Sequence, residues 1–121
     1  MSDFTSEQKA LFDVLCCIMI SDGVASGTEK KQIIKALNAE GATHDQSDYV
    51  ELIGGFGQRV RTEGFKTVRS SVLEELKAMD DSKASEVLCK AVKLARSDED
   101  FSDREQDSIE FFQSALFPDG L

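Results

Sequence analysis

The residues of this sequence with the clearest capacity for chemistry are acidic side chains in two similar segments. Residues 21–29 read Ser-Asp-Gly-Val-Ala-Ser-Gly-Thr-Glu, and residues 97–105 read Ser-Asp-Glu-Asp-Phe-Ser-Asp-Arg-Glu. Two Ser, one Asp and one Glu therefore occur at the same four positions of both segments, 76 residues apart. Carboxylate oxygens are the ligands that Ca²⁺ and Mg²⁺ prefer. If the two segments pack together, their matching carboxylates predict a divalent-cation site formed by Asp22, Glu29, Asp98 and Glu105.

Each segment also carries the signature of a helix cap. Ser26 lies three residues before Glu29, and Ser102 lies three residues before Glu105. In a capping box, the serine hydroxyl accepts from a backbone N–H of the first turn, and the glutamate carboxylate accepts from the N–H of the serine. Under this interpretation the chain is a small structural or oligomerisation module, and its acidic segments only begin two helices.

Other types of site fit the sequence poorly. An EF-hand that began at Asp98 would need Gly at the place of Asp103 and Glu at the place of Ile109. The one histidine, His44, lies in a polar loop, and the cysteines lack the spacing of a zinc site. The glycine-rich run 54–57 lacks the Lys-Ser/Thr of a phosphate-binding loop. A carboxylate-dependent metal hydrolase stays as an alternative, although no residue points to a substrate.

The composition is that of a soluble globular protein with a large acidic excess. The chain has 121 residues, 31% of them charged, and a net charge of −9. The length predicts a single domain over 1–121. The negative charge opposes binding to nucleic acid and favours a cation or a basic partner protein. The few clustered basic residues are expected to form a solvated helix face, or to dock on the acidic segments of a second copy: Arg59, Arg61, Lys66 and Arg69.

We expect a cytoplasmic protein without direct membrane insertion. The first residues lack the basic stretch and apolar core of a signal peptide. The longest apolar run, 14–20, is far shorter than the roughly 20 residues that cross a bilayer. The odd set of Cys16, Cys17 and Cys89 is typical of a reducing compartment. We expect these thiols to pack in the core as small apolar groups.

The elements that must position these residues are predicted to be helices. Apolar residues recur at three- and four-residue spacing, whereas no segment alternates as a strand does. The first helix begins at a capping box formed by Thr5 and Gln8 and runs to Asp22-Gly23, and its apolar character predicts a central place. Gly54, Gly55 and Gly57 are expected to mark close packing or a break in the third helix. The later helices are expected over about 27–37, from Asp45 or Ser47 to Gly64, and over 66–79, 83–96 and 102–116. The fold class is therefore all-α, a single compact bundle of about six helices with an internal helix-loop-helix duplication.

The two segments resemble the TerB-like domain of tellurite-resistance proteins. The shared features are an apolar helix that ends in Ser-Asp-Gly, a small apolar position, then Ser, and Glu three residues later. They are found over 20–29 and again over 95–105, where Glu99 replaces the Gly. The resemblance implies an all-helical bundle with an internal repeat and an acidic surface that binds metal ions. It also implies a non-enzymatic role in tellurite resistance or a stress response, close to membrane-associated partner proteins.

Overall fold

The structure, a computed structural model, describes residues 5–20, 27–39, 41, 46–96 and 103–117. Within these ranges the chain forms helices and no strand. The prediction of an all-α bundle is confirmed, and no described helix is long and apolar enough to cross a membrane. The six helices are α1 (Ser6–Met19), α2 (Gly27–Ala39), α3 (Gln46–Glu63), α4 (Phe65–Lys77), α5 (Asp81–Arg96) and α6 (Asp103–Leu116).

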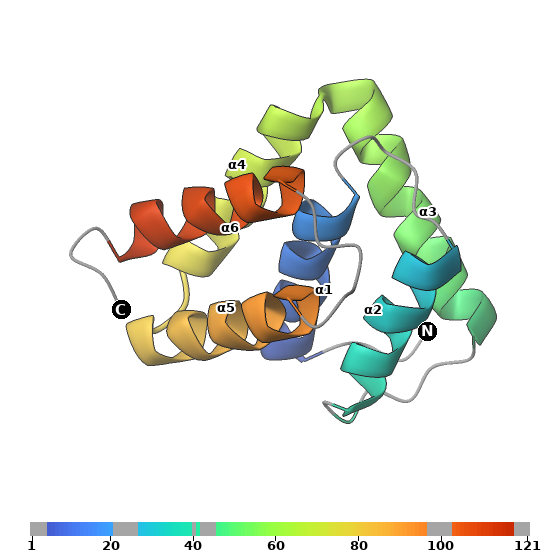
Figure 1. Ribbon diagram of the computed structural model, residues 1–121, viewed down its shortest axis with the longest axis horizontal. Coiled ribbons are helices and arrows are strands. Elements are labelled where there is room, and N and C mark those ends of the chain that lie inside the picture. Colours follow the sequence, from blue (N-terminus) through green and yellow to red (C-terminus); the bar gives the residue numbers. More distant parts are fainter. Residues whose placement is uncertain (1–4, 21–26, 40, 42–45, 97–102, 118–121) are drawn as a thin grey trace.

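Helix α1 lies at the centre of the bundle. All its residues from Ala10 onward are buried, and α1 packs against each of the other five helices (Figure 1). A helix that is apolar on every side is stable only when other elements enclose it. Helices α4, α5 and α6 also pack against one another, whereas α2 packs against α3. The central place predicted for the first helix is therefore confirmed.

The start of α1 follows its sequence signature, but its end does not. The backbone N–H of Gln8 donates to the Thr5 hydroxyl at 3.1 Å, and the backbone N–H of Thr5 donates to Gln8 Oε1 at 3.0 Å. This reciprocal pair confirms the predicted capping box. The helix ends at Met19 with Ile20 as its cap, earlier than the predicted stop at 22–23, which lies outside the described residues.

Helix α3 is continuous through its glycines. The expectation of a break is wrong, and close packing is wrong for Gly54 and Gly55, where an added Cβ would meet no atom within 4 Å. Packing outweighs the weak helix propensity of glycine here, because the apolar face of α3 is buried. That face consists of Tyr49, Ile53, Phe56 and Val60.

A single residue, Gly64, separates α3 from α4. Its φ of +93° lies in the left-handed region that glycine enters at little cost. The chain turns sharply there, and α4 runs back along α1 (Figure 1). Along α4, Glu75 then lies near α1 and Arg69 near α6.

The remaining boundaries differ slightly from the expected ones. Helix α2 extends two residues further, to Ala39, and α5 begins earlier, at Asp81. Helix α4 covers Phe65–Lys77 instead of 66–79. Such shifts of one or two residues are normal at helix ends.

Candidate functional site

The four carboxylates predicted to bind a cation are only partly placed by the structure. Asp22 and Asp98 lie outside the described residues. Glu29 lies half-buried in the first turn of α2, which packs against α1 and α3. Glu105 lies in the first turn of α6, is 7% exposed, and belongs to the helix that packs against α1, α4 and α5. In the described part of the chain, no group of three or more His, Cys, Asp or Glu could hold a metal ion. The cation site and the internal duplication stay predictions.

A different group of charged side chains lies between α1 and α4. Asp13 is buried in the middle of α1, with 4% exposed. One turn earlier, Lys9 Nζ donates to Asp13 Oδ2 at 2.7 Å and lies 3.8 Å from Glu75 Oε1 of α4. The carboxyl group of Glu75 therefore lies close to that of Asp13, because both are within 4 Å of the same ammonium nitrogen. We call Lys9, Asp13 and Glu75 the Asp13 cluster; it brings two carboxylates to one ammonium group.

The surroundings of the Asp13 cluster change the acidity of its members. Burial raises the pKa of Glu75 from 4.5 to about 7, and the hydrogen bond and negative charge of Asp13 act in the same direction. Lys9 and Arg59 oppose this rise. Burial lowers the pKa of Lys9, but the hydrogen bond and charge of Asp13, with the charge of Glu75, outweigh burial and raise it. Near neutral pH, Glu75 can therefore take up or release a proton.

The two cysteines of α1 are unsuited to nucleophilic chemistry. Cys16 and Cys17 are both buried, and burial raises the pKa of each thiol far above its usual value. The thiolate is the reactive form of cysteine, so these side chains act as core residues. The prediction of core packing is confirmed for them and wrong for Cys89, which is exposed on α5.

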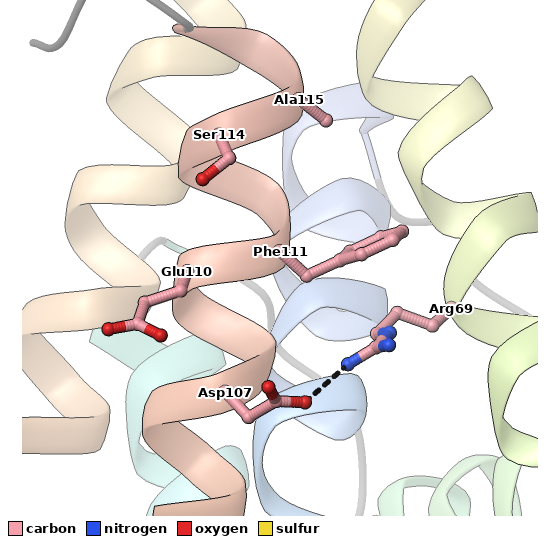
Figure 2. A pocket seen from close by; sticks show the side chains of 6 residues that line it. All are labelled: Arg69, Asp107, Glu110, Phe111, Ser114 and Ala115. Atoms are coloured by element: carbon pink, nitrogen blue, oxygen red, sulfur yellow. Dashed lines mark hydrogen bonds and ion pairs between the residues drawn. The ribbon is translucent and has the colours of Figure 1, made fainter.

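Arg69 of α4 forms a second buried charged contact, with α6 (Figure 2). Its side chain is 11% exposed, and the guanidinium lies 4.1 Å from the ring centre of Phe111 and 5.0 Å from that of Phe65. Nη1 donates to Asp107 Oδ2 at 3.2 Å and to Ser108 Oγ at 3.5 Å. The expectation that Arg69 belongs to a solvated face is wrong, because its flat cation fits between two aromatic rings.

The surface of α6 beside Arg69 is hollowed. A shallow depression of about 480 Å³ is lined by Arg69, Asp107, Glu110, Phe111, Ser114 and Ala115. In Figure 2, Asp107 and Phe111 point toward Arg69, whereas Glu110 points away from it. Three exposed acids of this helix, at i, i+4 and i+7, share one face, and we call them the α6 acidic stripe. They are Asp103, Asp107 and Glu110.

Two members of the Asp13 cluster, both on α1, could have been recognised from the sequence. Asp13 is the only charge between Leu11 and Ser21, and a charge in such a run needs a partner when it is buried. Lys9, four residues earlier on the same helix, is a natural first partner. Nothing in the sequence distinguished Glu75 from its exposed neighbour Glu74, because only the packing of α4 on α1 separates their surroundings.

Comparison of the chain with protein-family models, with curated protein sequences and with solved structures gave no match. The functional assignment therefore depends on the placement of the described residues and on the acidic pattern of the sequence.

Proposed function

We propose that the chain is a non-enzymatic, TerB-like binding module of a stress response such as tellurite resistance, whose acidic surface binds a divalent cation or a basic partner protein. The α6 acidic stripe is the main support for this proposal, because its three acids are exposed and two of them, Asp107 and Glu110, line a depression with an aromatic side. The net charge of −9 adds a long-range attraction for cations and basic surfaces. The partner would be a cytoplasmic or membrane-associated protein that presents Lys and Arg side chains.

The shape of the α6 acidic stripe favours a protein partner there. From Asp103 to Glu110 the helix rises about 10 Å, because each residue adds about 1.5 Å. A single Ca²⁺ holds its oxygen ligands at about 2.3–2.6 Å, so these carboxylates are too widely spread for one ion. A row of this length suits two or three basic side chains. We propose that the cation binds instead at the two acidic segments, through Asp22, Glu29, Asp98 and Glu105.

Binding of the partner is tested by neutralising two pairs of exposed acids, one pair in each of two double variants. The probe is a twelve-residue peptide rich in Lys and Arg, titrated into ¹⁵N-labelled protein at low and at physiological salt. We expect amide shifts along α6 that the double variant Asp107→Asn, Glu110→Gln loses. Asp48→Asn with Glu51→Gln is the matched control, because both residues are exposed and also lie three apart on one helix. Equal weakening by both double variants would show that only the overall charge attracts the peptide.

The cation is tested by thermal melting with Ca²⁺, Mg²⁺ or Mn²⁺ against chelator. A bound ion at a hundred times its dissociation constant should add about 2.7 kcal/mol to the free energy of unfolding. The rise should disappear in Asp22→Asn with Asp98→Asn and persist in the control Asp48→Asn with Asp80→Asn. No rise at millimolar concentration of any of the three ions contradicts the cation site.

A second candidate is an assembly module whose acidic segments serve only as caps. The specific observation in its favour is the capping box at Thr5 and Gln8, which shows that this chain uses the same spacing to begin a helix. On this hypothesis, Ser26→Ala and Ser102→Ala each lower the free energy of unfolding by about 1 kcal/mol and leave peptide binding unchanged. Sedimentation should then reveal a stable oligomer.

A further inference from the structure

We propose that Asp13 and Glu75 form a proton-binding site, which links the packing of α4 on α1 to pH. The site lies apart from the α6 acidic stripe and does not depend on the function proposed for it. Its two carboxyl groups come from different helices, so the proton that joins them also joins α1 to α4. When the proton leaves, this contact becomes a repulsion.

The two carboxyl groups differ in their freedom to reach water. Asp13 lies in the enclosed part of α1 with 4% exposed, so it cannot turn outward without opening the core. The side chain of Glu75 is 32% exposed and can turn toward solvent. Loss of the proton should therefore move Glu75 away from Asp13, because a buried carboxylate beside a second one is strongly disfavoured.

The cations around the site are too few to neutralise both acids. From α1, Lys9 lies 2.7 Å from Asp13 and 3.8 Å from Glu75, and the Lys9 side chain is itself 58% exposed. From α3, Arg59 acts on Glu75 but is shared with Glu63 at 3.4 Å.

On each of the other two helices that pack on α4, a charged residue is paired with a partner outside the Asp13 cluster. On α5, Lys83 pairs with Glu7 at 3.8 Å. On α6, Asp107 pairs with Arg69 at 3.2 Å. Lys9 and Arg59 thus face three carboxyl groups, those of Asp13, Glu75 and Glu63, and a shared proton supplies the missing positive charge.

The acidity of Glu75 gives the direction of the effect. Burial, with the hydrogen bond and charge of Asp13, raises its pKa from 4.5 to about 7. A carboxyl group whose pKa is higher in the folded state holds its proton more tightly there than in the unfolded chain. Its contribution to stability is therefore complete below about pH 4.5 and is lost as the pH rises through about 7.

The experiment compares thermal midpoints from pH 5 to pH 8.5 for the wild type, Glu75→Gln and Glu74→Gln. The amide of Glu75→Gln keeps a donor for Asp13 but cannot ionise. We expect its midpoint to lie close to that of the wild type near pH 5, and the difference to grow to about 5 °C near pH 8. Glu74→Gln is the control, because Glu74 precedes Glu75 on α4 and its side chain is 73% exposed. It should follow the wild-type profile. Parallel profiles for the wild type and Glu75→Gln would overturn the proposal.

A titration of the wild type by NMR gives an independent decision that needs no variant to fold. The carboxyl ¹³C resonance of Glu75 should titrate with a midpoint near 7. The methyl groups of Leu76 and Val72, which are buried on α4, should move with the same midpoint. A midpoint near the ordinary value of a glutamate, or methyl resonances that do not follow the proton, would refute the link to helix packing.

Discussion

Helix α4 makes two buried charged contacts, and they differ in the sign of the charge that needs a partner. Through Glu75 it meets α1, where two carboxylates compete for Lys9. Through Arg69 it meets α6, where one guanidinium lies between two aromatic rings and pairs with an exposed carboxylate. A proton can neutralise a carboxylate near neutral pH, whereas a guanidinium keeps its charge at any physiological pH. The contact between α4 and α1 therefore depends on pH, whereas the contact between α4 and α6 does not change over the physiological range.

The largest difference between the two contacts should appear when their carboxylates are removed. Asp13→Ala leaves a cavity at a residue with 4% exposed and deprives Lys9 of its acceptor. We expect a loss of about 2 kcal/mol in the free energy of unfolding, measured with urea at pH 6. Asp107→Ala should cost about 0.5 kcal/mol, because this side chain is 73% exposed and its ion pair lies near water. Equal losses would remove the distinction between a buried and an exposed acid.

A smaller effect separates charge from packing in the Arg69 contact. Arg69→Ala should lower the free energy of unfolding by about 1.5 kcal/mol, because the stem and the flat cation both leave the space between Phe65 and Phe111. Arg69→Met fills most of that space without a charge and should recover more than half of the loss. If the Met variant is as unstable as the Ala variant, the contact depends on the ion pair with Asp107 and not on the rings.

The fold could be predicted from the sequence more completely than the charged contacts of α4. Apolar spacing predicted the helices, and the largely apolar sequence of the first helix predicted its central place, because both depend on local residue patterns. The sequence left the continuity of α3 open, since the glycines at 54 and 55 lower local propensity while the buried face around Phe56 determines the outcome. Local propensity is a weak guide wherever tertiary packing decides.

The charged contacts could be predicted only in part, because their members are distant in sequence. Asp13 was visible as a lone charge in an apolar run, but its partner Glu75 depends on how α4 turns after Gly64. Arg69 lies in a basic stretch whose pattern predicts a solvated face. It is buried because Phe111 of α6 packs against it. For the predicted cation site, the structure places Glu29 and Glu105 but does not test their role.

The two cations that act on Glu75 should lower its pKa to different degrees. Lys9→Gln removes the nearer positive charge from Glu75, so the pKa of Glu75 should rise further, by about half a unit. Arg59→Gln should raise it less, because Arg59 is shared with Glu63 and its side chain is 42% exposed. Both changes are measured as the midpoint of the Glu75 carboxyl resonance. The reverse order would place Arg59, and not Lys9, as the main counter-charge.

The smallest effect comes from an ion pair at the surface, which provides a baseline for both contacts. Arg59 and Glu63 lie 3.4 Å apart with side chains 42% and 47% exposed, so Glu63→Gln should cost less than about 0.5 kcal/mol. At 1 M NaCl this cost should fall toward zero, because the Debye length of about 3 Å is then no longer than the distance between these solvent-exposed charges. The loss caused by Asp13→Ala should persist at the same salt concentration, since Asp13 is shielded from solvent. If salt removes both losses equally, Asp13 acts as a surface charge would, and burial does not explain its effect.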